Sequence, residues 1–294
     1  MRKRKQSLVL AKDGTAELGR RATWSPLLPV LIGVVMIAVL ATHWPVLSVQ
    51  AMTLDDESYV TYNHLVRNPS WESAAQFFGE VLRPSTVGGY YQPLTMTSLM
   101  LDWALGARVE NLRVFHRTSL ILHVLNTVLV ILILYRLFER PVPAALVGLL
   151  FGVHPLAVEP IAWITERKTL LAALFSLATV LSYLGYARRP AAWRYGGVVS
   201  LFILALLSKP TSTPLPVLLL LLDFWPLGRV SRRAVYEKIP LLIIAGVSAV
   251  ITVISQAATA SLTRPPEYTA WWIPLTVCHN LVFYLSKMVW PVDL

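Results

Sequence analysis

The fold is decided by residues 24–59, which read WSPLLPVLIGVVMIAVLATHWPVLSVQAMTLDDESY. The part from 24 to 49 is almost entirely apolar, and a helix of about 20 such residues spans the hydrocarbon core of a bilayer. It is too long to be a removed signal peptide, and it lacks a small-residue cleavage site. We therefore expect a retained membrane-spanning helix, with the consecutive acids Asp55, Asp56 and Glu57 beyond its far end.

The composition of the whole chain supports a membrane protein. Of its 294 residues, 55% are hydrophobic and only 14% are charged, and the mean hydropathy is +0.58. The formal net charge of +10 lies mainly between apolar runs, which is the distribution that orients a membrane protein and does not require a nucleic-acid partner. The single cysteine, Cys278, excludes a disulfide framework and a cysteine-based metal site.

Further apolar runs follow the first one. We expect roughly eight spans, at residues 24–49, 115–138, 144 to the turn at 154, 170–186, 196–207, 217–225, 239–255 and 275–290. The predicted fold class is therefore all-α, a polytopic transmembrane helical bundle. Gly148 and Gly152, four residues apart in the third span, predict close packing against a neighbouring helix.

Basic residues indicate the orientation of this bundle. The stretch 1–22 holds seven lysines and arginines directly before the first span. Because such residues stay on the cytoplasmic side, we expect 1–22 to be a cytoplasmic N-terminus and 23–294 to be the transmembrane domain. Residues 50–113 would then form the first extracytoplasmic loop.

Within that loop, apolar residues recur at near-helical spacing in 71–82 and again in 94–105. This spacing predicts helices that lie in the membrane interface. Pro93 follows a glycine-containing loop and is suited to begin the second of them. At its other end the chain stops at Leu294 directly after an apolar run, so we expect the domain to be C-terminally incomplete.

Polar groups collect on the outer face if this topology holds. They are Asp55 and Asp56, His154 and Glu159 beside prolines, Arg167 and Lys168 in one turn, and Lys209 in a hairpin broken by prolines. A charge near the bilayer centre costs about 2.5–3.5 kcal/mol on insertion scales, so Glu159 should face a cavity or a partner. Irregular backbone around Lys209 is tolerated only where it is buried in protein or lines a wet cavity.

Each group also has a plainer interpretation. The acids can be a solvated loop cluster, and His154 can serve to cap or pair with its neighbours. Arg167 and Lys168 can form an interfacial turn whose cations meet lipid head groups.

Acids and cations on one face suit group transfer from a phosphate. A carboxylate can act as general base toward an acceptor hydroxyl, and cations can stabilise a phosphate leaving group. The glycine-rich phosphate loop of soluble nucleotide chemistry is absent from the sequence.

Several stretches resemble a known family when taken in order. They are Tyr91-Gln92-Pro93-Leu94-Thr95, Phe115-His116 with His123 and Asn126, GVHPLAVE at 152–159, AWITERK at 162–168, LLSKP at 206–210 and LDFWPLGR at 222–229. Together with the Asp55-Asp56 pair, they resemble the GT-C superfamily of glycosyltransferases. More specifically, they are similar to the transmembrane and tetratricopeptide-repeat O-mannosyltransferases and their bacterial relatives. At Glu166 and Thr169 the chain departs from the pattern of the animal members.

The resemblance implies a GT-C-like fold, a sugar donor linked through phosphate to a hydrophobic lipid, and inverting transfer to a hydroxyl outside the cytoplasm. By position, it implies that Asp55 is the base and Asp56 its acidic neighbour. The groups implied to contact the donor phosphate or line its cavity are Glu159, Arg167, Lys168, Lys209 and His154.

We therefore expect a membrane glycosyltransferase that moves a hexose such as mannose from a polyprenyl-phosphate carrier to a hydroxyl, on protein, at the extracytoplasmic face of a bacterial inner membrane. Two other classes stay open: a non-catalytic membrane scaffold or fragment, and a transporter for a lipid-linked anion. We expect no required cofactor and no resident metal, although adjacent acids could hold a divalent cation through their oxygens.

Overall fold

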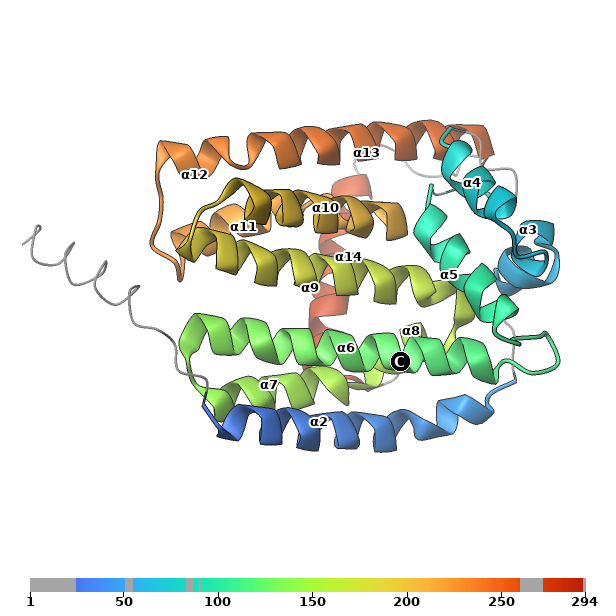
Figure 1. Ribbon diagram of the computed structural model, residues 1–294, viewed down its shortest axis with the longest axis horizontal. Helices are drawn as coiled ribbons and strands as arrows, with labels where there is room; N and C mark the ends of the chain where they lie inside the picture. The colour runs from blue at the N-terminus through green and yellow to red at the C-terminus, as the bar shows by residue number, and fades with distance from the viewer. Residues whose placement is uncertain (1–24, 51–54, 83–86, 90, 260–271, 293–294) are drawn as a thin grey trace, which may run out of the picture.

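The computed structural model describes residues 25–50, 55–82, 87–89, 91–259 and 272–292. The predicted cytoplasmic stretch 1–22 lies outside these residues. Within them the structure is helical and has no β-strand, which confirms the predicted all-α class. Most of the long helices run alongside one another and form a bundle, with shorter helices gathered at one end (Figure 1).

The bundle is built from helices that match the apolar segments of the sequence, together with one short helix in the basic stretch between residues 225 and 239. They are α2 (Leu27–His43), α6 (Arg113–Phe138), α7 (Pro141–Gly152), α9 (Arg167–Arg188), α10 (Ala192–Ser208), α11 (Leu215–Phe224), α12 (Arg232–Tyr236), α13 (Ile239–Thr259) and α14 (Trp272–Val289). Unlike the others, α14 runs across the bundle axis in Figure 1, and it buries none of its residues.

Four described helical segments are long and apolar enough to cross a membrane: Leu27–Ser48, Arg113–Phe138, Ile164–Arg188 and Arg232–Ala258. The helix pair Pro141–Gly152 and Pro155–Ala162, bent by 57°, brings the number to five if it is one broken span. Helices α10 and α11 are shorter, with 17 and 10 residues. The predicted figure of roughly eight crossings therefore stays a prediction.

Glycines let α7 pack closely against its neighbours, as their spacing predicts. A Cβ atom at Gly148 would lie 2.2 Å from Cγ1 of Ile131 on α6, and one at Gly152 would lie 2.4 Å from Cγ2 of Val39 on α2. Both distances are shorter than any real Cβ contact, so a larger residue would push the helices apart.

Short helices form a cap at one end of the bundle, which we call the loop end. They are η2 (Glu57–Thr61, a π-helical turn), α3 (His64–Arg67), α4 (Trp71–Gly79) and α5 (Pro93–Ala104). Pro93 begins α5, as predicted. Their apolar side chains, among them Val66, Phe77 and Leu99, share a core with Phe115 and Ile164 of the bundle. The cap is therefore packed onto the bundle.

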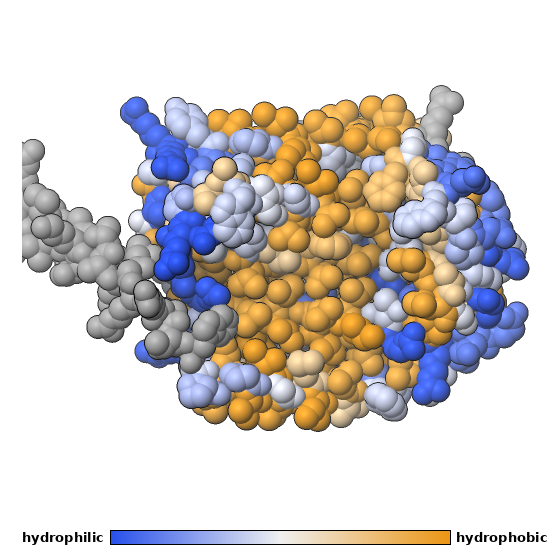
Figure 2. Space-filling model, viewed as in Figure 1, coloured by the Kyte–Doolittle hydropathy of each residue, from blue (hydrophilic) through white to orange (hydrophobic). Residues whose placement is uncertain are grey.

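Four short elements join the bundle helices at the loop end. The elements η3 (Pro155–Ala157), α8 (Val158–Ala162) and η4 (Ile164–Glu166) lead into α9, and η5 (Pro210–Ser212) follows α10. The opposite end, which we call the basic end, carries most of the arginines among the described residues: Arg136, Arg140, Arg188, Arg189, Arg194, Arg229, Arg232 and Arg233. Figure 2 shows an apolar band across the middle of the molecule, with hydrophilic residues at both ends.

Candidate functional site at the loop end

The two adjacent aspartates occupy different environments. Asp56 is buried, and its Oδ1 accepts a hydrogen bond from the backbone N–H of Thr165, 2.9 Å away. Asp55 is exposed, and its backbone carbonyl accepts hydrogen bonds from the N–H groups of Ser58 and Tyr59 at the start of the π-helical turn. The structure thus ties one carboxylate into the protein and leaves the other accessible.

Two lysines meet beside one carboxylate where α9 begins. Lys168 Nζ lies 3.3 Å from Glu166 Oε1, and Lys209 Nζ lies 3.3 Å from Glu166 Oε2. Lys209 also donates a hydrogen bond to Thr169 Oγ1 at 2.8 Å, and the Thr169 hydroxyl donates to Glu166. We call these four residues the lysine cluster. One carboxylate faces two ammonium groups, so the lysine cluster retains a positive charge that favours an anion.

Tyr59 connects the acidic turn to the lysine cluster. Lys168 Nζ lies 5.2 Å from the centroid of the Tyr59 ring, within cation–π range. The Asp55 charge acts on both Tyr59 and Lys168. Burial raises the pKa of Tyr59, so its phenol stays protonated near neutral pH. Gln92 Nε2 donates a hydrogen bond to the Tyr59 hydroxyl and joins the loop before α5 to this group.

Arg167, which is expected to contact the donor phosphate or line its cavity, forms all its observed contacts within the protein. Its side chain is fully buried, with Nη1 2.8 Å from Asp102 Oδ2. Its nitrogens also donate hydrogen bonds to Ser119 Oγ at 3.1 Å, Ser98 Oγ at 3.0 Å and the Phe115 carbonyl at 2.6 Å. Because every guanidinium nitrogen already has a protein partner, Arg167 holds α5, α6 and α9 together.

Among the described residues, neither His154 nor Glu159 forms a hydrogen bond or an ion pair with the lysine cluster. His154 Nδ1 accepts a hydrogen bond from the N–H of Leu156, and its Nε2 lies 3.0 Å from the carbonyl of Met288 on α14. This capping contact matches the plainer interpretation of His154. Glu159 is exposed on α8, and its carboxylate has no ion pair among the described residues.

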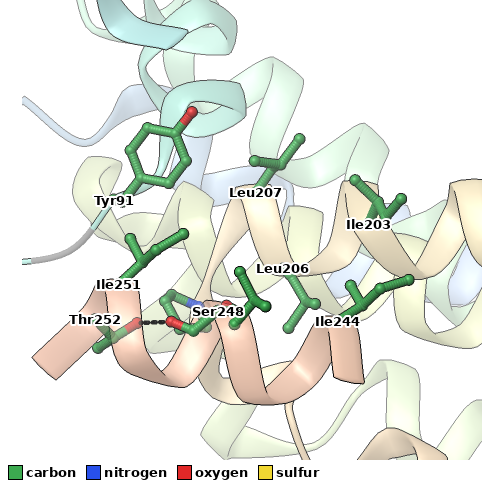
Figure 3. Close-up of a pocket in the computed structure, with 10 residues that line it drawn as sticks. Tyr91, Ile203, Leu206, Leu207, Ile244, Ser248, Ile251 and Thr252 are labelled. Atoms are coloured by element: carbon green, nitrogen blue, oxygen red, sulfur yellow. Dashed lines mark hydrogen bonds between the residues drawn. The ribbon is translucent and has the colours of Figure 1, made fainter. Parts of the chain in front are cut away.

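An apolar groove runs from the loop end along α10 and α13 (Figure 3). It encloses about 140 Å³ and is lined mainly by leucine, isoleucine and valine side chains of the two helices. Thr252 donates its hydroxyl to the carbonyl of Ser248 in its own helix, which leaves the wall apolar. Tyr91 and Pro210 also line the groove. These residues adjoin Gln92 and Lys209 in the chain, so the groove reaches the backbone segments that carry both of them.

Within the described ranges, no three side chains of histidine, cysteine, aspartate or glutamate lie close enough to hold a metal ion together.

Sequence reasoning missed three contributors to this region. Asp102 is a lone acid in an apolar helix, and such a residue needs a buried cation nearby. Glu166 was visible as an acid within a run of cations. The role of Tyr59 has no signal in the sequence, because it depends on how the π-helical turn faces α9.

The fold and the apolar helices define an integral, multi-pass membrane protein. The chain is similar to several curated protein O-mannosyl-transferases. It is 31% identical to Tmtc2 of Drosophila melanogaster over 121 residues, which cover 41% of this chain and 12% of the relative. It is 35% identical to TMTC1 of Mus musculus over 111 residues, which cover 37% of this chain and 12% of the relative.

A longer match links the chain to Tmtc1 of Drosophila melanogaster, at 29% identity over 170 residues that cover 56% of this chain and 18% of the relative. These matches confirm the resemblance predicted from the ordered motifs. The matched part spans less than a fifth of each of these three relatives. No protein-family model matches the chain. No solved structure matches it either.

Proposed function

We propose that the protein is a membrane glycosyltransferase that moves a hexose, mannose in the first instance, from a polyprenyl-phosphate carrier to a hydroxyl group of a protein. The observation that carries the proposal is that the turn bearing the accessible Asp55 lies against the positively charged lysine cluster, with Lys168 Nζ 5.2 Å from the Tyr59 ring, and that an apolar groove is lined in part by Pro210, the residue after Lys209. The similarity to protein O-mannosyl-transferases supports the choice of reaction.

In this proposal Asp55 is the general base. Its carboxylate takes the proton from the acceptor hydroxyl as the hydroxyl oxygen attacks C1 of the sugar. The bond between C1 and the phosphate oxygen breaks, the polyprenyl phosphate leaves, and the configuration at C1 inverts. Asp56 keeps Asp55 in place through its hydrogen bond to Thr165.

Lys168 and Lys209 are proposed to bind the donor phosphate. Charge that develops on the leaving phosphate is stabilised by donors that are already in position. Glu166 holds both ammonium groups near one point while leaving the group cationic. Their side chains are 7% and 18% exposed, so the charges are partly desolvated and still reachable.

The apolar groove is proposed to take the first isoprene units of the carrier. A prenyl chain needs an apolar surface that continues from the phosphate site into the bilayer. Pro210, the residue after Lys209, is among the residues that line the groove. The groove is walled by side chains of α10 and α13 (Figure 3).

We further propose that the loop end lies outside the cytoplasm and the basic end inside, in a bacterial inner membrane, since arginines and lysines favour the cytoplasmic side. The lysine cluster supplies the phosphate counter-charge, so the proposed reaction requires no cofactor. A divalent cation at Asp55 is the competing arrangement. If sugar transfer survives excess EDTA, the cofactor-free arrangement is supported. If EDTA abolishes transfer and added Mg²⁺ or Mn²⁺ restores it, the divalent cation at Asp55 is supported.

The test uses membranes that contain the protein, a polyprenyl-phosphate mannose with labelled sugar, and an unfolded polypeptide acceptor. Label on the polypeptide, absent from membranes without the protein, supports the proposal. Donor binding without transfer contradicts it and points to a scaffold. Movement of the donor across the bilayer without transfer contradicts it and points to a transporter.

A further inference from the structure

A second cavity lies at the basic end, far from the lysine cluster. It has a volume of about 520 Å³ and is lined by Tyr186, Tyr195, Arg233, Tyr236, Glu237 and Pro240. These residues come from the end of α9, the start of α10 and the junction of α12 with α13. Nothing in the proposed transfer reaction uses this cavity.

The one acid in the cavity wall is already neutralised. Arg229 Nη2 lies 2.6 Å from Glu237 Oε2, and Arg233 Nε lies 3.3 Å from Glu237 Oε1. The Tyr186 hydroxyl also donates to Oε1, at 2.8 Å. The nearby buried Asp223 is paired with Lys238 and accepts a hydrogen bond from the hydroxyl of Tyr183. The two carboxylates of this region therefore leave little negative charge to repel an anion.

Positive charge remains available at the cavity. The side chain of Arg233 is 74% exposed, and its terminal nitrogens form no hydrogen bond with the described residues. Arg232, the preceding residue, is exposed as well. The planar fork of arginine donates two parallel hydrogen bonds to a phosphate, which makes Arg233 suited to phosphate recognition.

The surroundings of the cavity favour a lipid over a soluble phosphate. Pro240 in its wall begins the exposed apolar surface of α13, where Ile239, Leu242 and Ile243 are 43%, 42% and 61% exposed. Tyrosines and arginines at the end of a span lie at the depth of lipid head groups. Anionic lipids attract basic residues at that depth by about 1 kcal/mol each.

We propose that this cavity binds an anionic phospholipid, with the head-group phosphate on Arg233 and the acyl chains along α13. The bound lipid bridges α9 and α10 to α12 and α13. The proposal does not depend on the transferase reaction, because its residues lie at the other end of the bundle (Figure 1).

Native mass spectrometry of the detergent-solubilised protein tests the proposal, with phosphatidylglycerol and phosphatidylcholine of equal chain length as probes. We expect one phosphatidylglycerol to stay bound in preference to phosphatidylcholine. Arg233→Ala should weaken its binding about tenfold, the loss expected for a charge-assisted contact. Arg140→Ala, an exposed arginine at the same end that does not line the cavity, is the matched control and should bind like the parent.

Because Arg233 is exposed, its replacement should leave the thermal unfolding temperature unchanged without lipid, which separates loss of binding from loss of fold. A second variant, Tyr236→Ala, should also weaken phosphatidylglycerol binding. Equal retention of both lipids, or an unchanged affinity in Arg233→Ala, overturns the proposal. Displacement of the lipid by millimolar inorganic phosphate also overturns it, since that result assigns the cavity to a soluble anion.

Discussion

The Oδ1 atom of Asp56 accepts a hydrogen bond from the backbone N–H of Thr165, 109 residues further along the chain. This contact fixes the acidic turn to the start of α9, where Lys168 and Glu166 lie. In the proposed function it gives the adjacent aspartates separate tasks, with Asp56 positioning the turn and Asp55 left to act on the substrate.

The first prediction concerns that positioning. Asp56→Ala leaves a buried N–H without a partner and should cost about 1–3 kcal/mol of stability, with most transfer activity lost. Asp56→Asn keeps an oxygen acceptor and should retain more of both. Thermal unfolding and the transfer assay together measure the two effects. If Asn and Ala lower activity equally at equal stability, the Asp56 charge itself acts in the reaction, and the positioning role is wrong.

A second prediction concerns Arg167. Its replacement by Met leaves Asp102 buried without its ion-pair partner, so the protein should lose roughly 3–5 kcal/mol of stability. The double variant Arg167→Met with Asp102→Leu should recover part of that loss, because no unpaired charge remains. The apparent unfolding temperature in detergent measures both. A single variant of normal stability with only a weakened affinity for donor would show that Arg167 contacts the phosphate.

The third prediction concerns Lys209. Lys209→Gln removes a charge-assisted contact worth about 1.5–3 kcal/mol, so KM for the donor should rise roughly ten- to a hundredfold. Stability should change little, since Glu166 keeps Lys168 as an ion-pair partner. Arg113→Gln, an exposed cation at the same end, is the control and should leave KM unchanged. Equal effects of the two variants would mean that only the general charge of the surface matters.

The fourth prediction tests the groove. Ser248→Phe places a ring in a space of about 140 Å³ and should hinder a prenyl chain. Transfer from a long-chain donor should fall by at least about tenfold, since each buried methylene contributes about 0.8 kcal/mol. Transfer from a donor with a single isoprene unit should change little. If transfer from both donors falls equally, the substitution disturbs the protein itself and does not specifically block binding of the prenyl chain.

The apolar segments could be read from the sequence because hydrophobicity is a local property. It located α2, α6, α9 and α13 to within a few residues, and the spacing of Gly148 and Gly152 predicted the close packing of α7. The course of α14 could not be predicted, because its apolar composition suits a helix along the bundle as well as one across it.

The candidate site was predictable as a set of charges and not as a set of contacts. Asp55, Lys168 and Lys209 were recognised from charge placed beside apolar runs. Pairing partners are decided by tertiary contacts between distant segments. The ion pair of Arg167 with Asp102, which lies 65 positions earlier in the chain and 2.8 Å away, could therefore not be predicted.

Sugar transfer by the Asp55→Asn variant is the most direct test of the central claim, that Asp55 is the general base. The variant is compared with Glu57→Gln, which changes an exposed acid in the same turn, in membranes with matched protein levels. If Asp55 is the base, its variant should transfer about 10²- to 10⁴-fold less labelled mannose, while donor binding and Glu57→Gln stay close to the parent. Transfer by Asp55→Asn at the parent rate would contradict the account.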